Sequence, residues 1–407
     1  MPYAPTSRRR PAHASPATSP ERVYLDHAAT TPLAPEALEA MMPYFAASFG
    51  NASTLYREGR QAREALEQAR EVLAEALGAS PPEVCFTSGG TESNNALIAG
   101  ICIASRRRLG AQKAGHVVAS AFEHPAVLEP VAALKRAGFE VTLVRPGHDG
   151  FVSPDALKDA LKDNTALVSV MAANNEVGTI QPVRELAAAA HERGALFHTD
   201  AVQALGKVGF SVAELGVDAA SFSAHKVGGP KGVGAFYLRR TTPFEPQQLG
   251  GGQEGMRRAG TQNVAGAVGF ATAASRACEP GRLLAEAARL VALRDGLAAR
   301  LAALGARVRM SVPLPPGDVQ RHLPGLVSFT VNGLDSQTML VSLDEAGFAL
   351  SAASACSASS LKASHVLLSL GMPRDRALGA LRVSMGEQTN ARQIDAFVHT
   401  LSGMLKT

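Results

Sequence analysis

Short apolar runs alternate with helix-like segments from about residue 22 to about residue 280. Over residues 62–77, apolar side chains recur every three or four positions and Gly78 follows as a suitable C-terminal cap, which predicts a helix. Short continuous apolar runs predict buried strands at 84–87, 117–121, 167–171, 196–199, 219–223 and 233–238. Helical stretches such as 184–193 separate several of these runs. The alternation predicts an α/β fold with a mostly parallel sheet flanked by helices.

The pattern changes around residue 280. A long helix rich in Ala, Leu and Arg is predicted over about 282–304, and a strand follows at 326–332. A stretch rich in Ser and Ala covers 351–360, and a last helix ends the chain. This order predicts a smaller α+β domain after the large one.

The composition is that of a folded protein. The chain has 407 residues, of which 46% are hydrophobic and 19% charged. No apolar run reaches the roughly 18 residues of a membrane span, so we expect no membrane partner. The four cysteines (Cys85, Cys102, Cys278 and Cys356) contain no CxxC pair, which excludes a disulfide scaffold and a zinc ribbon. We expect a soluble, cytoplasmic protein.

The net charge of +4 is concentrated at the N-terminus. Residues 1–20 hold Arg8, Arg9 and Arg10 and no acidic residue, so the rest of the chain is nearly neutral. Without a basic stripe on the folded part, we expect no direct nucleic-acid binding. The tail is rich in Pro, Ala and Ser, which predicts disorder, and it lacks the apolar core of a secretory signal. We interpret it as a bacterial extension, with an organelle-targeting peptide as the alternative.

Polar clusters follow four of the predicted strands. They are SGGTESN at 88–94, NNE at 174–176, Asp200, and the pair His225 and Lys226. Ligands of open α/β sheets bind at the carboxyl ends of the strands. The four clusters therefore predict a catalytic site on one edge of the sheet.

Three of these clusters together suit one cofactor. SGGT at 88–91 lies before a predicted helix, where backbone N–H groups bind an anion, although an ordinary capped turn has the same pattern. Asp200 ends an apolar strand and needs a cationic partner, whether a ligand, a salt bridge or a helix cap. Lys226 begins a Gly-rich loop where an amine of lowered pKa forms a Schiff base, and spacing does not choose between it and Lys231. A lysine, an aspartate and a phosphate loop are the set that pyridoxal phosphate requires.

Other motifs are weaker. GGGQEG at 250–255 has the spacing G-x-G-x-x-G but lies far from the first strand–helix unit, so it is a poor dinucleotide signal.

His124 follows a predicted strand, where a catalytic histidine and a merely packed histidine show the same pattern. Cys356 lies in a small-residue stretch that predicts a mobile loop presenting a thiol, whereas Cys85 and Cys102 have apolar neighbours and are predicted to be buried and inert. The 11 histidines show no HExxH spacing, so we expect no metal site.

With these residues in place, the sequence resembles the cysteine desulfurases of the NifS/IscS type, in class V of the fold-type I pyridoxal phosphate enzymes. The resemblance runs from Val23 to about Phe397. It is carried by YLDHAATTP at 24–32, TSGGTESNN at 87–95, NNEVG at 174–178, HTDAVQ at 198–203, SAHK at 223–226, GPKGVG at 229–234, SAC at 354–356 and LRVSMG at 381–386.

The resemblance also implies a division of the chain. Residues 1–21 form a disordered basic tail, and 22–35 an N-terminal segment that packs with the small domain. Residues 36–280 form the large α/β domain that binds the cofactor. Residues 281–407 form the small α+β domain, which carries the loop of the catalytic cysteine.

The resemblance implies three catalytic residues. Lys226 rather than Lys231 holds the cofactor covalently, and His124 stacks on its ring and moves protons. Cys356 attacks the sulfur of the substrate.

Further residues are implied to bind the cofactor and the substrate. Asp200 pairs with the pyridinium nitrogen, and Asn175 and Gln203 contact the ring substituents and phenolic oxygen. The groups that bind the phosphate are the side chains of Thr91, Ser223 and His225 and the backbone at Gly90. Thr261 reaches the phosphate of the neighbouring subunit, which implies a homodimer. Arg382 and Asn175 bind the substrate, with the guanidinium of Arg382 on its carboxylate.

The implied reaction removes sulfur from L-cysteine, giving L-alanine and a persulfide on Cys356. The persulfide passes to a sulfur acceptor, such as an iron–sulfur scaffold or a thiouridine-forming enzyme that acts in tRNA thiolation. No resident metal is implied, although the persulfide can transiently ligate a cluster on a scaffold. The alternatives are a selenocysteine lyase or another β-lyase, and a non-catalytic paralog that acts as a scaffold.

Four positions depart from the family pattern. Tyr56 stands where members usually have histidine, and Ala353 where the cysteine loop has glycine. Lys362 and Ala363 replace a common Glu-Pro pair, so docking of the scaffold is expected to differ. None of these changes removes a core catalytic residue.

Overall fold

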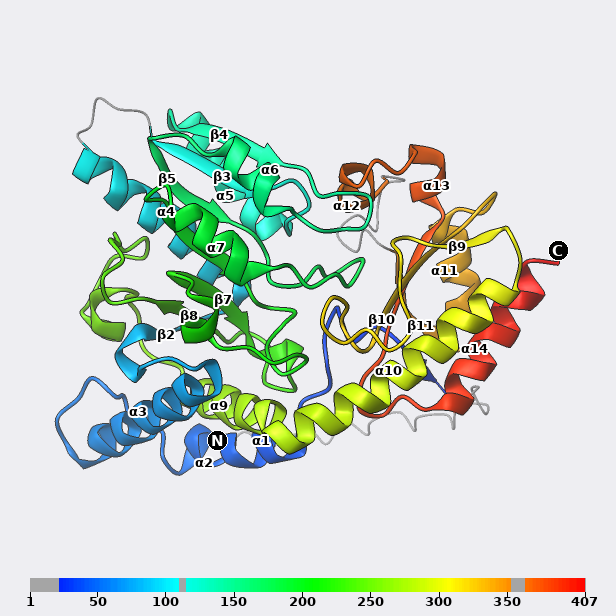
Figure 1. The fold of residues 1–407 in the computed structure, drawn as a ribbon. Helices are drawn as coiled ribbons and strands as arrows, with labels where there is room; N and C mark the ends of the chain where they lie inside the picture. The colour runs from blue at the N-terminus through cyan, green and yellow to red at the C-terminus, as the bar shows by residue number, and fades with distance from the viewer. Residues whose placement is uncertain (1–21, 110–114, 353–362, 407) are drawn as a thin grey trace, which may run out of the picture.

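A seven-stranded mixed sheet lies at the centre of the larger part of the molecule (Figure 1). The computed structural model describes residues 22–109, 115–352 and 363–406. The strands, in spatial order, are β2 (Val84–Thr87), β8 (Gly234–Leu238), β7 (Ala219–Ser223), β6 (Leu196–Asp200), β5 (Thr165–Ser169), β3 (His116–Ser120) and β4 (Glu140–Val144). β8 is antiparallel to both of its neighbours, and the other pairings are parallel. The predicted α/β class is confirmed, and only β8 runs against the common strand direction.

β4 is the one strand of this sheet that the apolar pattern missed. It lies at the edge of the sheet, and its side chains are mostly half-exposed or exposed, Leu143 included. An edge strand with one solvated side has no continuous apolar run. The other predicted strands are confirmed to within two residues at either end.

Helices cover both faces of this sheet (Figure 1). They are α1 (Pro35–Met41), α2 (Pro43–Ala46), α3 (Arg57–Leu77), α4 (Gly90–Leu109), α5 (Pro125–Arg136), α6 (Pro154–Ala160), α7 (Val183–His191), α8 (Val212–Leu215) and α9 (Val264–Cys278). Short 3-10 turns are η1 (Pro81–Glu83), η2 (Ala224–Lys226) and η3 (Gln253–Met256). The helix predicted over 62–77 is α3, which packs its apolar side on α9 and ends at Gly78 in the left-handed conformation, as the sequence indicated.

The smaller part is a four-stranded antiparallel sheet covered by long helices. Its strand order is β12 (Ser351–Ala352), β13 (Ala380–Ser384), β10 (Leu326–Val331) and β9 (Val308–Met310). The helices are α10 (Pro280–Ala303), α11 (Ser336–Glu345), α12 (His365–Ser369), α13 (Arg374–Leu378) and α14 (Ala391–Met404). A second apolar core, which includes Leu297, Phe329 and Phe397, lies between sheet and helices.

The N-terminal segment joins this smaller part. β1 (Val23–Tyr24) pairs in parallel with β11 (Phe348–Ala349), and Asp26 bridges to Ser384 at the end of β13. The segment then crosses to the large sheet, where Thr31 N donates to the carbonyl of His225. The contacts follow the expected course of 22–35, while the exact domain boundaries stay a prediction.

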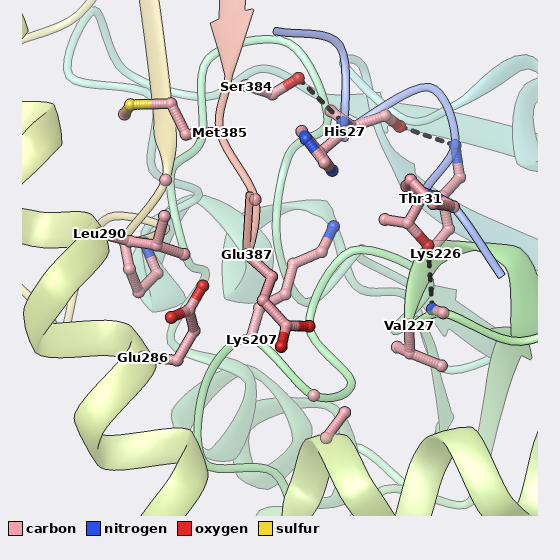
Figure 2. Close-up of a pocket in the computed structure, with 18 of the residues that line it drawn as sticks. His27, Thr31, Lys207, Lys226, Val227, Glu286, Leu290, Ser384, Met385 and Glu387 are labelled. Carbon is pink, nitrogen blue, oxygen red and sulfur yellow. Dashed lines mark hydrogen bonds between the residues drawn. The ribbon is translucent and has the colours of Figure 1, made fainter. Parts of the chain in front are cut away.

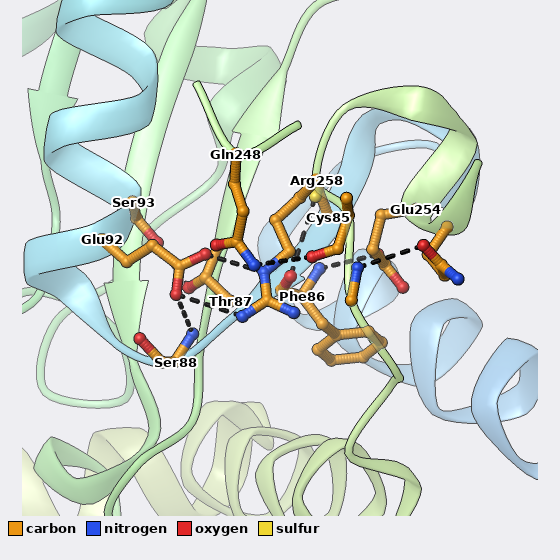
Figure 3. A network of polar contacts seen from close by, with 12 residues as sticks. Cys85, Phe86, Thr87, Ser88, Glu92, Ser93, Gln248, Glu254 and Arg258 are labelled. Atoms are coloured by element: carbon orange, nitrogen blue, oxygen red, sulfur yellow. Dashed lines mark hydrogen bonds and ion pairs between the residues drawn. The ribbon is translucent and has the colours of Figure 1, made fainter. Parts of the chain in front are cut away.

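A buried ion pair holds the Gly-rich segment 250–258 against the edge of the large sheet. Both carboxylate oxygens of Glu254 accept from Arg70 of α3, at 2.6 and 2.9 Å, and Glu254 Oε2 also accepts from the backbone N–H of Phe86 at 2.9 Å. Figure 3 shows Glu254 beside Phe86. Glu254 and Met256 adopt left-handed φ angles of 50° and 62°, which cost energy outside glycine. The segment therefore forms a turn that the contacts of Glu254 hold in place, rather than a dinucleotide-binding loop.

Replacing Arg70 tests the contribution of the buried ion pair with Glu254 to stability. Arg70→Met leaves the buried carboxylate of Glu254 without its counter-ion, and we expect the free energy of unfolding to fall by about 3–5 kcal/mol. Urea unfolding followed by circular dichroism measures the change. Arg57→Met, on the exposed side of the same helix, is the control and should leave the stability unchanged. Equal stability of the Arg70 and Arg57 variants would contradict the assignment.

Candidate active site

The polar clusters at the four strand ends come together as the sequence predicted. β2, β5, β6 and β7 run in the same direction, so their carboxyl ends lie at one edge of the sheet. Asp200, at the end of β6, is buried, and its two carboxylate oxygens accept from Asn94 Nδ2 at 2.7 Å and from Val202 N at 3.0 Å. Asn94 belongs to α4, so this contact joins the first cluster to the third.

Lys226 follows β7 directly and points back toward the N-terminal segment. Its Nζ donates to the carbonyl oxygens of Ala28 at 2.7 Å and Ala29 at 2.6 Å. Lys226 and Asp200 are close enough for their charges to shift the pKa of His124. Lys231, in contrast, is exposed. The structure thus brings Lys226 rather than Lys231 to the predicted site.

His124 caps the N-terminus of α5 beside Lys226. Its Nδ1 accepts from the backbone N–H of Ala126 at 3.0 Å, so the proton of the neutral ring lies on Nε2. Burial lowers the pKa of His124, the charges of Lys226 and His365 lower it further, and Asp200 opposes them. A neutral ring with a fixed tautomer suits a group that covers the cofactor and exchanges a proton at Nε2.

The start of α4 is arranged for an anion. The first N–H groups of the helix, at Gly90 and Thr91, have no acceptor within the helix. A Cβ at Gly90 would lie 2.7 Å from Val202 Cγ2, so this turn requires glycine. Glu92 fixes the turn by accepting from Ser88 N at 2.8 Å and from Arg258 Nε at 2.8 Å (Figure 3).

Positive charges surround the other expected phosphate ligands. His225 Nδ1 lies 3.1 Å from Thr30 Oγ1, and Ser223 is buried beside it at the end of β7. Burial is the main cause that lowers the pKa of His225 to about 4, and the charges of Lys226, Lys231 and Lys207 add to it. Three lysines near one point create a positive potential that attracts a phosphate.

Arg382 is the most deeply buried cation of the site. It lies on β13 with 1% of its surface exposed, and it donates from Nη1 to the carbonyl of Asn175 at 2.9 Å and from Nη2 to Asp26 Oδ1 at 2.8 Å. Its Nε has no partner in the described part of the chain. A buried, unpaired N–H on a guanidinium is suited to receive a carboxylate.

The sequence assigned no role to three buried ionisable groups around the site, of which Glu176 belongs to the predicted cluster at 174–176. Glu176 accepts from Ser364 Oγ, and burial raises its pKa to about 7, against the opposing effects of Ser364 and Arg382. Lys207 donates to Gln203 Oε1, and Gln203 Nε2 donates to the carbonyl of Ala28 at 2.8 Å. Glu123 is fully buried beside His124. Glu123 could have been found from the sequence, because a glutamate next to an apolar strand is unusual.

The other predicted residues are either placed elsewhere in this chain or lie outside the described residues. Thr261 is exposed, as expected of a residue that serves a neighbouring subunit, and Tyr56 is an exposed residue at the start of α3. Cys356, Ala353 and Lys362 lie outside the described residues, and Ala363 packs against the main core. The prediction that Cys85 and Cys102 are buried is confirmed, and burial raises the pKa of both thiols.

The residues present fit pyridoxal phosphate. A buried aspartate is available to pair with a ring nitrogen, a lysine amine and a histidine lie near it, and the helix start and positive charges suit a phosphate. Within the described ranges, no cluster of three or more side chains suited to a metal occurs. The same residues include no helix that is long and apolar enough to cross a membrane.

Comparisons with known proteins point the same way. Residues 23–397 match the family model described as aminotransferase class-V. The chain is 43% identical over 384 residues to the cysteine desulfurase IscS of Dictyoglomus turgidum, which covers 94% of each chain. A solved structure described as a NifS-like protein superposes with a TM-score of 0.86 at 36% identity, covering 95% of this chain and 99% of that one. SspA in complex with cysteine superposes with a TM-score of 0.76 at 33% identity, covering 89% and 98%.

The protonation of Glu123 gives a test of the electrostatics. Burial raises the pKa of Glu123 to about 8, although Ser120 and the N–H of Met171 donate to Oε1, and the charge of Asp200 adds to the rise. The folded state therefore binds a proton that the unfolded state releases above pH 4.5. The stability contribution of this proton is lost as the pH rises from 4.5 to about 8.

We expect Glu123→Gln to remove this part of the pH dependence, because an amide does not ionise. The melting temperature of the native protein, measured by calorimetry, should decline more between about pH 5 and pH 8 than that of the variant. Glu123→Ala loses the acceptor for Met171 N and should be less stable at every pH. Parallel curves for the native protein and Glu123→Gln would show that Glu123 is ionised at neutral pH.

Proposed function

Because the chain belongs to the class-V aminotransferase family, among the cysteine desulfurases of the NifS/IscS type, we propose that it removes the sulfur of L-cysteine and releases L-alanine. The observation that carries the proposal is the meeting of Lys226, Asp200 and His124 at one edge of the sheet, with Arg382 across from them on β13. L-cysteine as the substrate is supported by the structural neighbour that is in complex with cysteine.

The cofactor of this family, pyridoxal phosphate, supplies an electron sink for the bonds at the substrate Cα. The chain's residues hold it in place. The carboxylate of Asp200 would accept a hydrogen bond from the protonated ring nitrogen, and Asn94 and Val202 fix the orientation of this carboxylate. The N–H groups at the start of α4, with Thr91, Ser223 and His225, bind the phosphate.

Lys226 has two tasks. Its Nζ would hold the cofactor covalently and, once released, would take the proton from the substrate Cα. General base catalysis of this kind contributes about 10²–10⁴ in rate. The two carbonyls of Ala28 and Ala29 keep Nζ at the site. His124 closes the opposite side and exchanges a proton at Nε2.

Arg382 binds the substrate carboxylate. Its unpaired Nε–H and one N–H of Nη2 offer a two-point contact, while the carbonyl of Asn175 holds the other end of the guanidinium. The bond to Asp26 fixes the plane of the group. A lysine at this position has no such fork and is expected to bind the substrate more weakly.

The sulfur is taken by Cys356 in this proposal. Residues on either side of 353–362 lie next to the substrate site, since Ser351 Oγ donates to the carboxylate of Asp26 at 2.7 Å and Ser364 Oγ donates to Glu176. The thiolate attacks the substrate sulfur, and the Cβ–S bond breaks with its electron pair left on carbon. Protons then complete the methyl group of alanine, and Cys356 holds the persulfide.

The persulfide passes to an acceptor protein. We propose an iron–sulfur scaffold or a thiouridine-forming enzyme, on the strength of the family alone. A cytoplasmic location is likewise proposed from the composition of the chain, with an organelle reached through the tail over 1–21 as the alternative.

A homodimer is supported by apolar side chains on one part of the surface. Phe49, Leu55, Leu249 and Met256 are each more than 70% exposed. Met256 lines the same hollow as Ala52 and Arg63, so the segments 42–56 and 249–258 adjoin. Thr261 is exposed a few residues further along. A second copy of the chain covering this area would bring Thr261 within reach of its neighbour's phosphate site.

The dimer is tested by charged substitutions on this surface. The pair Phe49→Asp and Met256→Asp should give a monomer in sedimentation equilibrium, because burial of two carboxylates in an apolar interface is costly. The monomer should also retain less cofactor, since Thr261 of the second copy is lost. Leu284→Asp, an exposed apolar position on α10, is the control and should stay dimeric. A dimeric double variant would place the interface elsewhere.

The function is tested by product analysis with L-cysteine and a reducing thiol. We expect alanine and sulfide from the native protein, a loss of at least about 10³-fold in Cys356→Ala because no other group takes the sulfur, and cofactor still bound in that variant. Comparable turnover by Cys356→Ala would point to a lyase that forms no persulfide. A colourless native protein without turnover would point to a non-catalytic paralog.

A further inference from the structure

A second lysine lies beside the one assigned to the cofactor. Lys207 follows β6 by a few residues, and its side chain lines the same cavity as Lys226 (Figure 2). In that view its amine points toward His27. The positive charge of Lys207 is among the causes that lower the pKa of His27, which agrees with a short distance between the two side chains.

Lys207 is linked to Lys226 through one glutamine. Lys207 Nζ donates to Gln203 Oε1, and Gln203 Nε2 donates to the carbonyl of Ala28 at 2.8 Å. The same carbonyl accepts from Lys226 Nζ at 2.7 Å. These contacts fix which end of the Gln203 amide is nitrogen, because a reversed amide would set its oxygen against the carbonyl of Ala28.

The surroundings of Lys207 are strongly charged. Burial is the main cause that lowers the pKa of Lys207 to about 7, and the positive charges of Lys226 and Arg382 follow. The other ionisable groups that line the cavity, from the N-terminal segment, α9, α10 and the residues after β13, are His27, Arg276, Arg282, Glu286 and Glu387. Arg276 and Arg282 both pair with Glu387, and Arg276 also pairs with Glu36, so two carboxylates balance the two guanidinium charges.

We propose that Lys207 is a positioning residue for the cofactor chemistry: its amine fixes the amide of Gln203 and, in its protonated form, favours the unprotonated nitrogen at Lys226. A nearby cation destabilises a second positive charge. Lys226 must lose its proton to hold the cofactor and to act as a base. Lys207 therefore promotes both steps without touching the substrate. The inference deepens the proposed function and rests on it for the identity of the cofactor.

The experiment follows the visible absorbance of the bound cofactor in the holoenzyme as a function of pH. In Lys207→Met, we expect the midpoint of the titration to rise by about one pH unit, because a positive neighbour is gone. Lys207→Arg keeps a positive charge and an N–H donor and should leave the midpoint at or below its native value. Lys162→Met, which removes an exposed lysine, is the matched control and should match the native protein.

Lys207→Gln separates the two effects. Its amide still donates toward Gln203 but carries no charge, so the midpoint should rise as in Lys207→Met. In both neutral variants kcat should fall about tenfold with little change in KM for L-cysteine, because Lys207 acts through Lys226 and Gln203 rather than on the substrate. If Lys207→Met and Lys207→Gln both lose the cofactor while Lys207→Arg retains it, the result also supports a need for positive charge at this position.

The results that would contradict the role of Lys207 differ from the result that would contradict the proposed function. A cofactor-loaded Lys207→Met whose midpoint equals that of the native protein overturns the proposal, whatever its melting temperature. Loss of cofactor from all three Lys207 variants also overturns it, because packing alone would then explain the residue. A native protein that binds no pyridoxal phosphate rejects the proposed function instead, before any variant is compared.

Discussion

The guanidinium of Arg382 connects three parts of the chain that are far apart in sequence. It lies on the sheet of the smaller part, donates to Asn175 in the larger part, and pairs with Asp26 in the N-terminal segment. A buried cation is costly without partners, so the two parts and the N-terminal segment must come together for the charge to be tolerated. The geometry that satisfies Arg382 is also the geometry that brings the proposed carboxylate-binding group to the N-terminal segment whose carbonyls accept from Lys226.

The large domain follows closely from local sequence patterns. β2, β6 and β7 are short, mostly buried segments that begin with small or apolar residues and have polar residues at or directly after their ends, and this order identifies both the strand and its functional end. β4 was missed because an edge strand needs no apolar run. The motifs that resemble a known family were decisive for Lys226 against Lys231, where spacing offered no choice.

The contacts around the site were beyond the reach of sequence. The pairing of Arg382 with Asp26, the shared carbonyl of Ala28 and the link from Lys207 to Gln203 depend on how distant loops meet. The Gly-rich segment 250–255 has the spacing of a dinucleotide-binding loop, but, in line with the weak signal in the sequence, it forms a turn held by the ion pair of Arg70 and Glu254. In both cases the deciding interactions join residues that no local window contains.

The position of the N-terminal segment also bears on the order in which the protein is made. Residues 22–35 leave the ribosome early, yet their partners in β11 and β13 are synthesised more than 300 residues later. Asp26 cannot meet Arg382 until nearly the whole chain is available, so the closing contact spans almost the full sequence. Completion of the part of the site around Arg382 is therefore a late event in synthesis, well after the residues assigned to the cofactor have been made.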